Sequence, residues 1–95
     1  QSWARAVYWT AKSAQQGNQA SARNLERGDH KAHLREFTVN SFSLDLLDKP
    51  SVNSKRIASV SMGGKVYKLG EQGGFTHVYV PEGFRLGFIE TKSLQ

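Results

Sequence analysis

The sequence predicts a mainly β protein, with a small five-stranded barrel over residues 38–95 and an N-terminal extension over residues 1–37. Short runs of alternating apolar residues recur about every ten residues after Phe37. Each run ends at Gly or Pro, and seven of the nine Gly lie between Gly63 and Gly87. Such spacing is typical of small sandwiches and barrels, and closure into a barrel removes the exposed edges of a small sheet.

The segment Trp3–Thr10 fits two periodicities. With a period of about 3.6 residues, Val7 and Ala11 share a helical face. With alternating residues, Val7 shares a strand face with Trp3 and Trp9. Because β-branched and aromatic residues favour strands, a strand is preferred here over a short helix.

The remainder of the extension is polar and small. Residues 13–24 predict a linker or an exposed loop. Ala20–Arg27 overlaps the end of this stretch and fits a short helix that ends at Gly28 in the C′ position. Asp29 fits the cap of a second short turn, whereas His33–Val39 fits a strand almost equally well.

The strands after Phe37 follow from alternation and from the residues that interrupt it. Phe42, Leu44 and Leu46 alternate with Ser43 and Asp45, which places three large apolar groups on one face. The expected strands are Phe42–Leu47, the segment around Ile57 and Val60, Lys65–Leu69, Phe75–Val80 and Leu86–Ile89.

Composition excludes several classes of protein. Cysteine is absent, which removes disulfides, cysteine nucleophiles and thiolate metal sites. The net charge of +5 is spread over both parts of the chain, so the basic stripe of a nucleic-acid-binding protein is missing and nucleic acid is not a favoured partner. No apolar run reaches the length of about 18 residues that spans a bilayer. The chain opens at Gln1 without Met, which leaves a processed terminus and a secreted origin open.

Three stretches carry a recognisable pattern. Leu44–Ser51 (LDLLDKPS) is similar to L-N-V-R-S-G-P-S, and Lys65–Phe75 (KVYKLGEQGGF) is similar to K-V-x-V-L-G-E-x-G-G-W. Glu82–Ile89 (EGFRLGFI), with the tail Thr91–Leu94, is similar to D-G-x-x-G-W-V followed by S-x-Y-L. Over residues 38–95 the sequence therefore resembles the bacterial SH3 domain, an SH3-like barrel attached to many cell-wall enzymes and envelope proteins.

The sequence also departs from that pattern. Phe75 and Phe88 replace the usual Trp, and we expect both to fill the barrel. Leu47 replaces Arg, Lys49 replaces Gly, and Ser93 replaces the Tyr of the tail. The core positions stay apolar, so these changes bear on ligand specificity more than on the fold. Binding of polyproline II peptides, which needs an aromatic groove, is not expected.

The resemblance implies a non-catalytic binding module of the cell envelope, periplasmic or extracellular, that contacts peptidoglycan or protein partners. The expected surface lies between the long loop Asp45–Lys55, which includes Asp48, and the later strands, with positive and aromatic groups reading a peptide or a glycan. The alternative is a structural subunit of a large envelope assembly, such as a secretion or conjugation machine. In that case the N-terminal segment would dock on a neighbouring subunit.

Two groups of aromatic residues are candidate contact sites. Tyr67, Tyr79 and Phe84 are expected to be exposed, because Tyr79 points away from its apolar strand neighbours, and they form either a contact patch or the outer cover of the barrel. Trp3 and Trp9, the only two Trp, are expected to dock on the barrel or on a partner.

No motif of an enzyme is present, neither G-x-S-x-G, nor a P-loop, nor H-E-x-x-H, and we expect no catalysis and no cofactor. His30 and His33 have the i, i+3 spacing of a metal pair, with Asp29 beside them. A metal site needs three or four ligands, so surface histidines are the preferred interpretation. His77 is expected to point outward from its strand.

Overall fold

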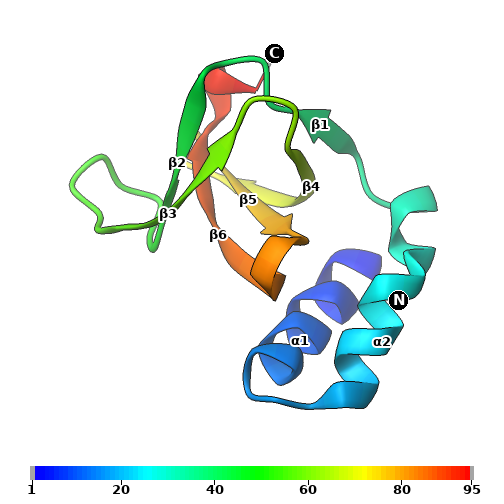
Figure 1. Cartoon of the computed structure of the whole chain (residues 1–95). Coiled ribbons are helices and arrows are strands. Elements are labelled where there is room, and N and C mark those ends of the chain that lie inside the picture. Colours follow the sequence, from blue (N-terminus) through cyan, green and yellow to red (C-terminus); the bar gives the residue numbers. More distant parts are fainter. Residues whose placement is uncertain (1, 95) are drawn as a thin grey trace.

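A computed structural model describes residues 2–94. Its helices are α1 (Trp3–Gln15) and α2 (Gln19–Arg27), and its short 3-10 helices are η1 (Asp29–Ala32), η2 (Glu82–Phe84) and η3 (Thr91–Ser93). The strands are β1 (Glu36–Thr38), β2 (Ser43–Leu47), β3 (Arg56–Ser61), β4 (Lys65–Gln72), β5 (Phe75–Val80) and β6 (Arg85–Glu90). The two helices lie side by side at one end of a strongly curved sheet (Figure 1). Neither helix in this part of the chain is long and apolar enough to cross a membrane.

The strands form one antiparallel sheet in the order β1-β4-β5-β6-β2-β3. The mainly β prediction is therefore confirmed, with six strands in place of five because Glu36–Thr38 pairs with the start of β4. The chain after β1 also contacts the turn between β3 and β4. The Val39 N–H donates to the Gly64 carbonyl, and the Gly63 N–H donates to the Val39 carbonyl, both at 2.9 Å. These bonds draw the two ends of the sheet toward each other.

The concave side of the sheet encloses the first core. Its buried members come from five strands and the segment after β1: Val39, Leu44, Leu46, Val60, Val66, Val78, Val80 and Ile89. Leu44 and Leu46 share this core as predicted, but Phe42 is 89% exposed because it precedes β2. The prediction that Phe42 belongs to the same face is wrong.

The convex side of the sheet is covered by the helices, and this contact forms the second core. Val7, Ala11 and Ala14 of α1 and Leu25 of α2 pack against Tyr67 and Tyr79. Residues on β5 are therefore buried on both faces, with Val78 and Val80 in the first core and Tyr79 in the second. Phe88 also lies on the covered side, half-buried and stacked on His77, so the prediction that it fills the barrel is wrong. Phe75 is buried, on the same strand face as His77.

The preference for a strand over Trp3–Thr10 is wrong, because these residues begin helix α1. The helix starts where the Ser2 hydroxyl accepts a hydrogen bond from the Arg5 N–H at 3.2 Å. Its buried residues, Val7, Ala11 and Ala14, recur at spacings of four and three, which is the period of a helix on a surface. Tertiary packing of this apolar stripe outweighs the local β preference of Val7-Tyr8-Trp9.

The prediction of a loop over residues 13–24 is also wrong, since they contain the end of α1, a tight turn and the start of α2. Gly17 supplies the turn with a φ of 95°, and the Asn18 side chain caps α2 by accepting from the Ser21 N–H at 2.9 Å. The predicted helix before Gly28 is confirmed, and Gly28 has the left-handed conformation expected of a C′ residue. The boundary expected between residues 37 and 38 falls inside β1.

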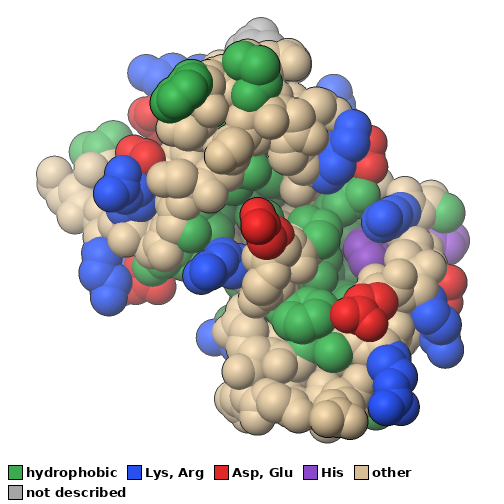
Figure 2. Space-filling model, viewed as in Figure 1, with side chains coloured by type: hydrophobic (Ala, Val, Ile, Leu, Met, Phe, Trp, Pro, Cys, Tyr) green, Lys and Arg blue, Asp and Glu red, His purple; other side chains and the backbone are tan. Residues whose placement is uncertain are grey.

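Charged groups are scattered over the face of the molecule in Figure 2, over both the sheet and the helical layer. Hydrophobic side chains line the hollow between these layers (Figure 2). This hollow has a volume of about 260 Å³, and its walls include Val60, Tyr67 and Val80, with Lys31 and Glu82 beside them.

Gly87 offers a test of the inner core. A Cβ atom at this buried position would lie 2.6 Å from Leu46 Cγ and 2.8 Å from the Leu47 carbonyl oxygen. We expect Gly87→Ala to lower the free energy of unfolding in urea by about 2–3 kcal/mol. Gly70→Ala is the matched control, because nothing lies within 4 Å of its added Cβ, and its effect should stay within about 1 kcal/mol. Equal effects of the two substitutions would contradict the packing described here.

Candidate functional site

Tyr67 and Tyr79 are each only 1% exposed, so the prediction that they form a contact patch on the surface is wrong. Tyr79 does point away from Val78 as predicted, but the helical layer covers that side. Burial raises the pKa of both phenols to about 12; for Tyr67, the hydrogen bond to Glu36 adds to the effect. Both side chains belong to the core.

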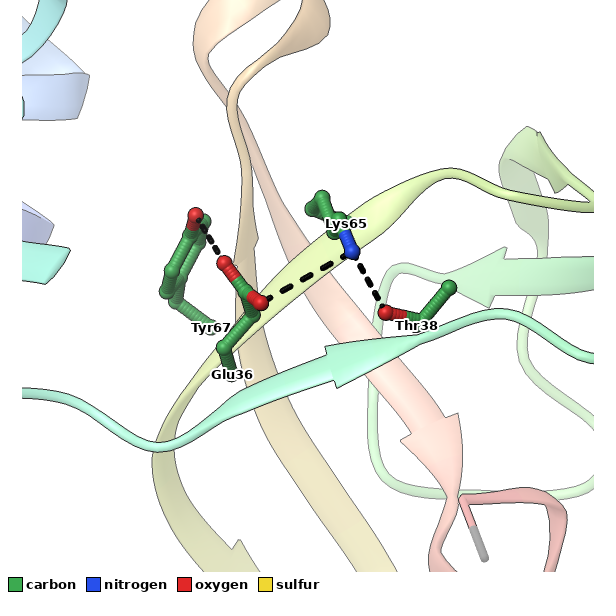
Figure 3. Close-up of polar contacts among 4 residues, drawn as sticks. All are labelled: Glu36, Thr38, Lys65 and Tyr67. Carbon is green, nitrogen blue, oxygen red and sulfur yellow. Dashed lines mark hydrogen bonds and ion pairs between the residues drawn. The ribbon is translucent and has the colours of Figure 1, made fainter.

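A polar cluster anchors the edge strand β1 to β4 beside Tyr67 (Figure 3). The Tyr67 hydroxyl donates to Glu36 Oε2 at 2.7 Å, and Lys65 Nζ lies 3.8 Å from Glu36 Oε1. Lys65 Nζ also donates to Thr38 Oγ1 at 2.7 Å. The register pairs Glu36 with Tyr67 and Thr38 with Lys65, so each contact joins neighbours across the strands. This cluster has a structural role.

Phe84 is half-buried and packs against the helical layer. Its φ of 54° places it in the left-handed region, where non-glycine residues are uncommon. Its carbonyl accepts a hydrogen bond from the Gln15 side chain at the end of α1. Phe84 therefore contacts the molecule's own helix more than the solvent.

Asp48 lies exposed at the base of the loop between β2 and β3. Its N–H donates to the Lys55 carbonyl at 3.0 Å, and the Lys49 N–H donates to Ser54 Oγ at 2.8 Å. These bonds hold the base of the loop together, and the loop extends from the sheet on the side away from the helices (Figure 1).

A pocket of about 460 Å³ lies between this loop, β2 and the C-terminal end of β6, and we call it the loop pocket. Its wall includes Ser43, Asp45, Leu47, Val52, Glu90 and Ser93. The position matches the surface expected from the sequence, but the chemistry does not. The lining holds two carboxylates and two hydroxyls, with no Lys, Arg or aromatic residue among the described ones, and Asp48 lies outside it.

Each carboxylate of the loop pocket forms an ion pair with a solvent-exposed cation. Arg56 Nη1 lies 3.5 Å from Asp45 Oδ1, and Lys92 Nζ lies 3.9 Å from Glu90 Oε2. Ion pairs that are this exposed contribute little stability. A cationic ligand would therefore displace them at low cost, and the pocket favours a group that carries ammonium and hydroxyl donors.

The two Trp residues lie on α1, where Trp9 is 63% and Trp3 40% exposed. Trp9 meets the Tyr8 ring edge to face at 5.0 Å, and Tyr8 in turn contacts His77 at 5.6 Å. Trp3 stacks on His33 at 4.2 Å. Each Trp is thus held by one neighbouring ring and keeps much of its surface open. The sequence identified both residues but placed them on a strand.

His77 lies on the outer face as expected, but α1 covers it and it is half-buried. Burial holds its pKa below the usual value for histidine. His30 is 4% exposed, so the preferred interpretation of a surface histidine is wrong for it. No alternation or cap signal in η1 distinguishes a buried from an exposed histidine, since its burial depends on contacts with distant strands.

His30 is held between the helices and the sheet. Its ring meets those of Tyr67 at 5.3 Å and Tyr79 at 5.5 Å, and its Nε2 has no hydrogen-bond partner within residues 2–94. Burial lowers the pKa of His30, Lys31 adds to this, and Asp29 opposes it. His33 is exposed and stacked on Trp3, so the two histidines do not face one ion. No group of three or more His, Asp or Glu in the described chain is placed to hold a metal.

No protein-family model matches the chain, and no curated protein matches it. The resemblance to bacterial SH3 domains therefore remains a proposal.

The buried imidazole predicts a pH dependence of stability. Because the folded state lowers the pKa of His30 below the ordinary value of 6.5, the unfolded chain binds more protons as the pH falls through that value. The free energy of unfolding should therefore decrease from pH 7.5 toward pH 5.5, a window set by the ordinary histidine pKa of about 6.5. His77 contributes in the same direction.

We expect His30→Phe to reduce this slope, measured by urea unfolding at several pH values, and His30→Phe with His77→Phe to reduce it further. His33→Phe, at an exposed position close by, is the matched control and should retain the contribution of His30. A slope unchanged by His30→Phe would show that its imidazole does not remain neutral in the core.

Proposed function

We propose that the protein is a non-catalytic binding module of the bacterial cell envelope, and that it contacts peptidoglycan or an envelope protein through the loop pocket. The observation that carries this proposal is the pocket itself, about 460 Å³ in volume and lined by Asp45, Glu90 and two serines. It lies beside the loop between β2 and β3, where the resemblance to SH3 domains leads one to expect a ligand surface.

The fold assignment within this proposal is an SH3-like barrel formed by β2 to β6. Support comes from the strand order β4-β5-β6-β2-β3, from the short helix η2 before the last strand, and from the Val39 bonds that draw the sheet ends together. The most specific part of the sequence pattern, Lys65–Phe75, forms the β4–β5 hairpin, whose turn at Gly73 and Gly74 has positive φ.

The chemistry of the loop pocket favours a hydroxyl-rich polymer that carries free amines. Hydroxyls of a glycan can donate to Asp45 and Glu90 and accept from Ser43 and Ser93. An ammonium group of a peptide would form charge-assisted hydrogen bonds to the carboxylates. Val52, which is 73% exposed at the rim, offers an apolar contact beside them.

A second candidate function is a structural subunit of a large envelope assembly. It is supported by the two Trp of α1, which are 40% and 63% exposed and offer large aromatic groups of the kind that anchor protein interfaces. The N-terminal helix already packs on its own sheet through Val7 and Ala11, so a neighbouring subunit would contact the opposite side of α1.

Sedimentation with purified peptidoglycan tests the first function. We expect the chain to co-sediment, and Asp45→Asn combined with Glu90→Gln to reduce the bound fraction about tenfold, because both carboxylates of the pocket lose their charge. Glu26→Gln is the matched control: Glu26 is exposed on α2, outside the pocket.

Absence of co-sedimentation by the unchanged chain would reject the peptidoglycan ligand and favour the assembly subunit. Co-sedimentation that the double substitution leaves unchanged would reject the loop pocket as its site.

A further inference from the structure

A second surface lies along the first half of α1 and the neighbouring part of β4, and we call it the aromatic groove. Two adjoining hollows of about 370 and 320 Å³ form it, and Ser2, Ala4 and Leu69 belong to the walls of both. Trp9 borders the first hollow and Trp3 the second. None of these residues belongs to the loop pocket.

Each Trp of the aromatic groove already packs against another ring of the folded chain. Trp9 is supported by Tyr8, which is itself held by His77 at 5.6 Å and by Lys12 Nζ, 5.6 Å above its ring. Trp3 is stacked on His33 with an angle of 3° between the rings. Rings that are already ordered lose little conformational freedom on binding, which is the property of aromatic anchors in protein interfaces.

The groove is also positively charged. Its walls include Arg5, Arg35 and Lys68, and contain no Asp or Glu among the described residues. Lys68 is paired with Glu71 at 2.6 Å, whereas no ion pair involves Arg5 or Arg35 within residues 2–94. Helix α1 itself carries Arg5 and Lys12 and no acidic residue. Arg35 also lies over the Phe37 ring, 4.8 Å from its centroid, and interacts electrostatically with Glu71. Three cations against this one carboxylate, beside two open indoles, leave the surface complementary to an apolar, acidic ligand.

We propose that the aromatic groove is a docking site for an acidic peptide segment of a protein partner. Apolar side chains of the segment lie against Trp3 and Trp9, and its carboxylates accept hydrogen bonds from Arg5 and Arg35. A peptide is favoured over a nucleic acid because the groove walls hold three cations among the described residues, one of them paired with Glu71, which is too few for a phosphate backbone track. The proposal rests on the second candidate function, a subunit of an envelope assembly, and specifies that its partner presents an acidic segment. It does not depend on the loop pocket.

Intrinsic fluorescence measures this binding directly, because the only two Trp of the chain both border the groove. The probe is a synthetic dodecapeptide of alternating Glu and Leu, with the Lys–Leu peptide of equal length and a single-stranded oligothymidine as comparisons. We expect saturable quenching or a spectral shift with the Glu–Leu peptide alone, weakened by added salt.

Substitutions locate the site. Arg5→Glu should lower the affinity for the Glu–Leu peptide about fivefold or more. It should not unfold the chain, since an acidic residue in the first turn of α1 favours the helix. Trp9→Ala should weaken binding about tenfold, with Trp3 still available as the reporter. Arg23→Glu, at an exposed position on α2 outside the groove, is the matched control and should change the affinity by less than about twofold.

Three results would overturn the proposal: no saturation by about 1 mM Glu–Leu peptide, equal binding of the Lys–Leu peptide, or equal effects of Arg5→Glu and Arg23→Glu. Oligothymidine binding that is lost in Arg5→Glu would assign the groove to nucleic acid instead. Binding of peptidoglycan should be unchanged in Arg5→Glu, so a failure of the groove and a failure of the loop pocket are separate results.

Discussion

The packing of α1 against the convex face of the sheet is the contact on which the rest of the structure depends. Val7 and Ala11 lie over Tyr67 and Tyr79, and together they bury the outer side of β4 and β5. Small residues on the helix allow close approach, and the large phenol rings of the sheet fill the space between the layers. The same contact encloses His30, and it determines which aromatic rings of α1 stay open to solvent.

The positions of both proposed binding surfaces follow from the covering of the sheet on its two faces. The concave side is filled by aliphatic residues and most of the convex side is covered by the helices, so little of β5 remains for a ligand apart from His77. Binding groups are left at the periphery, in the loop pocket beside β2 and in the aromatic groove beside α1. The loop and the helices lie on different sides of the sheet in Figure 1, which would allow two partners to bind at once.

The strands were predictable because their signals are local. Alternation placed Val78 and Tyr79 on opposite faces, and the Gly73-Gly74 turn marked the β4–β5 hairpin. The burial of Tyr79 was not predictable, since the cover comes from a helix more than sixty residues away in the sequence. The helix over Trp3–Thr10 was not predictable for a related reason. Its β-branched and aromatic residues favour a strand locally, and the helix is stabilised by packing of Val7 and Ala11 against the sheet. The long loop predicted a surface between it and the later strands, and a pocket lies there; its acidic lining was not predictable because Glu90 comes from a distant strand.

Reaction with a tyrosine-nitrating reagent, followed by mass spectrometry at each site, tests the docking of α1 most directly. The chain has three tyrosines, of which Tyr8 is partly exposed while Tyr67 and Tyr79 are each 1% exposed. Under native conditions Tyr8 should be nitrated first, and Tyr67 and Tyr79 only after global unfolding in urea. Nitration of Tyr67 and Tyr79 at the rate of Tyr8 in the native protein would show that the helices do not cover the sheet, and would contradict the account.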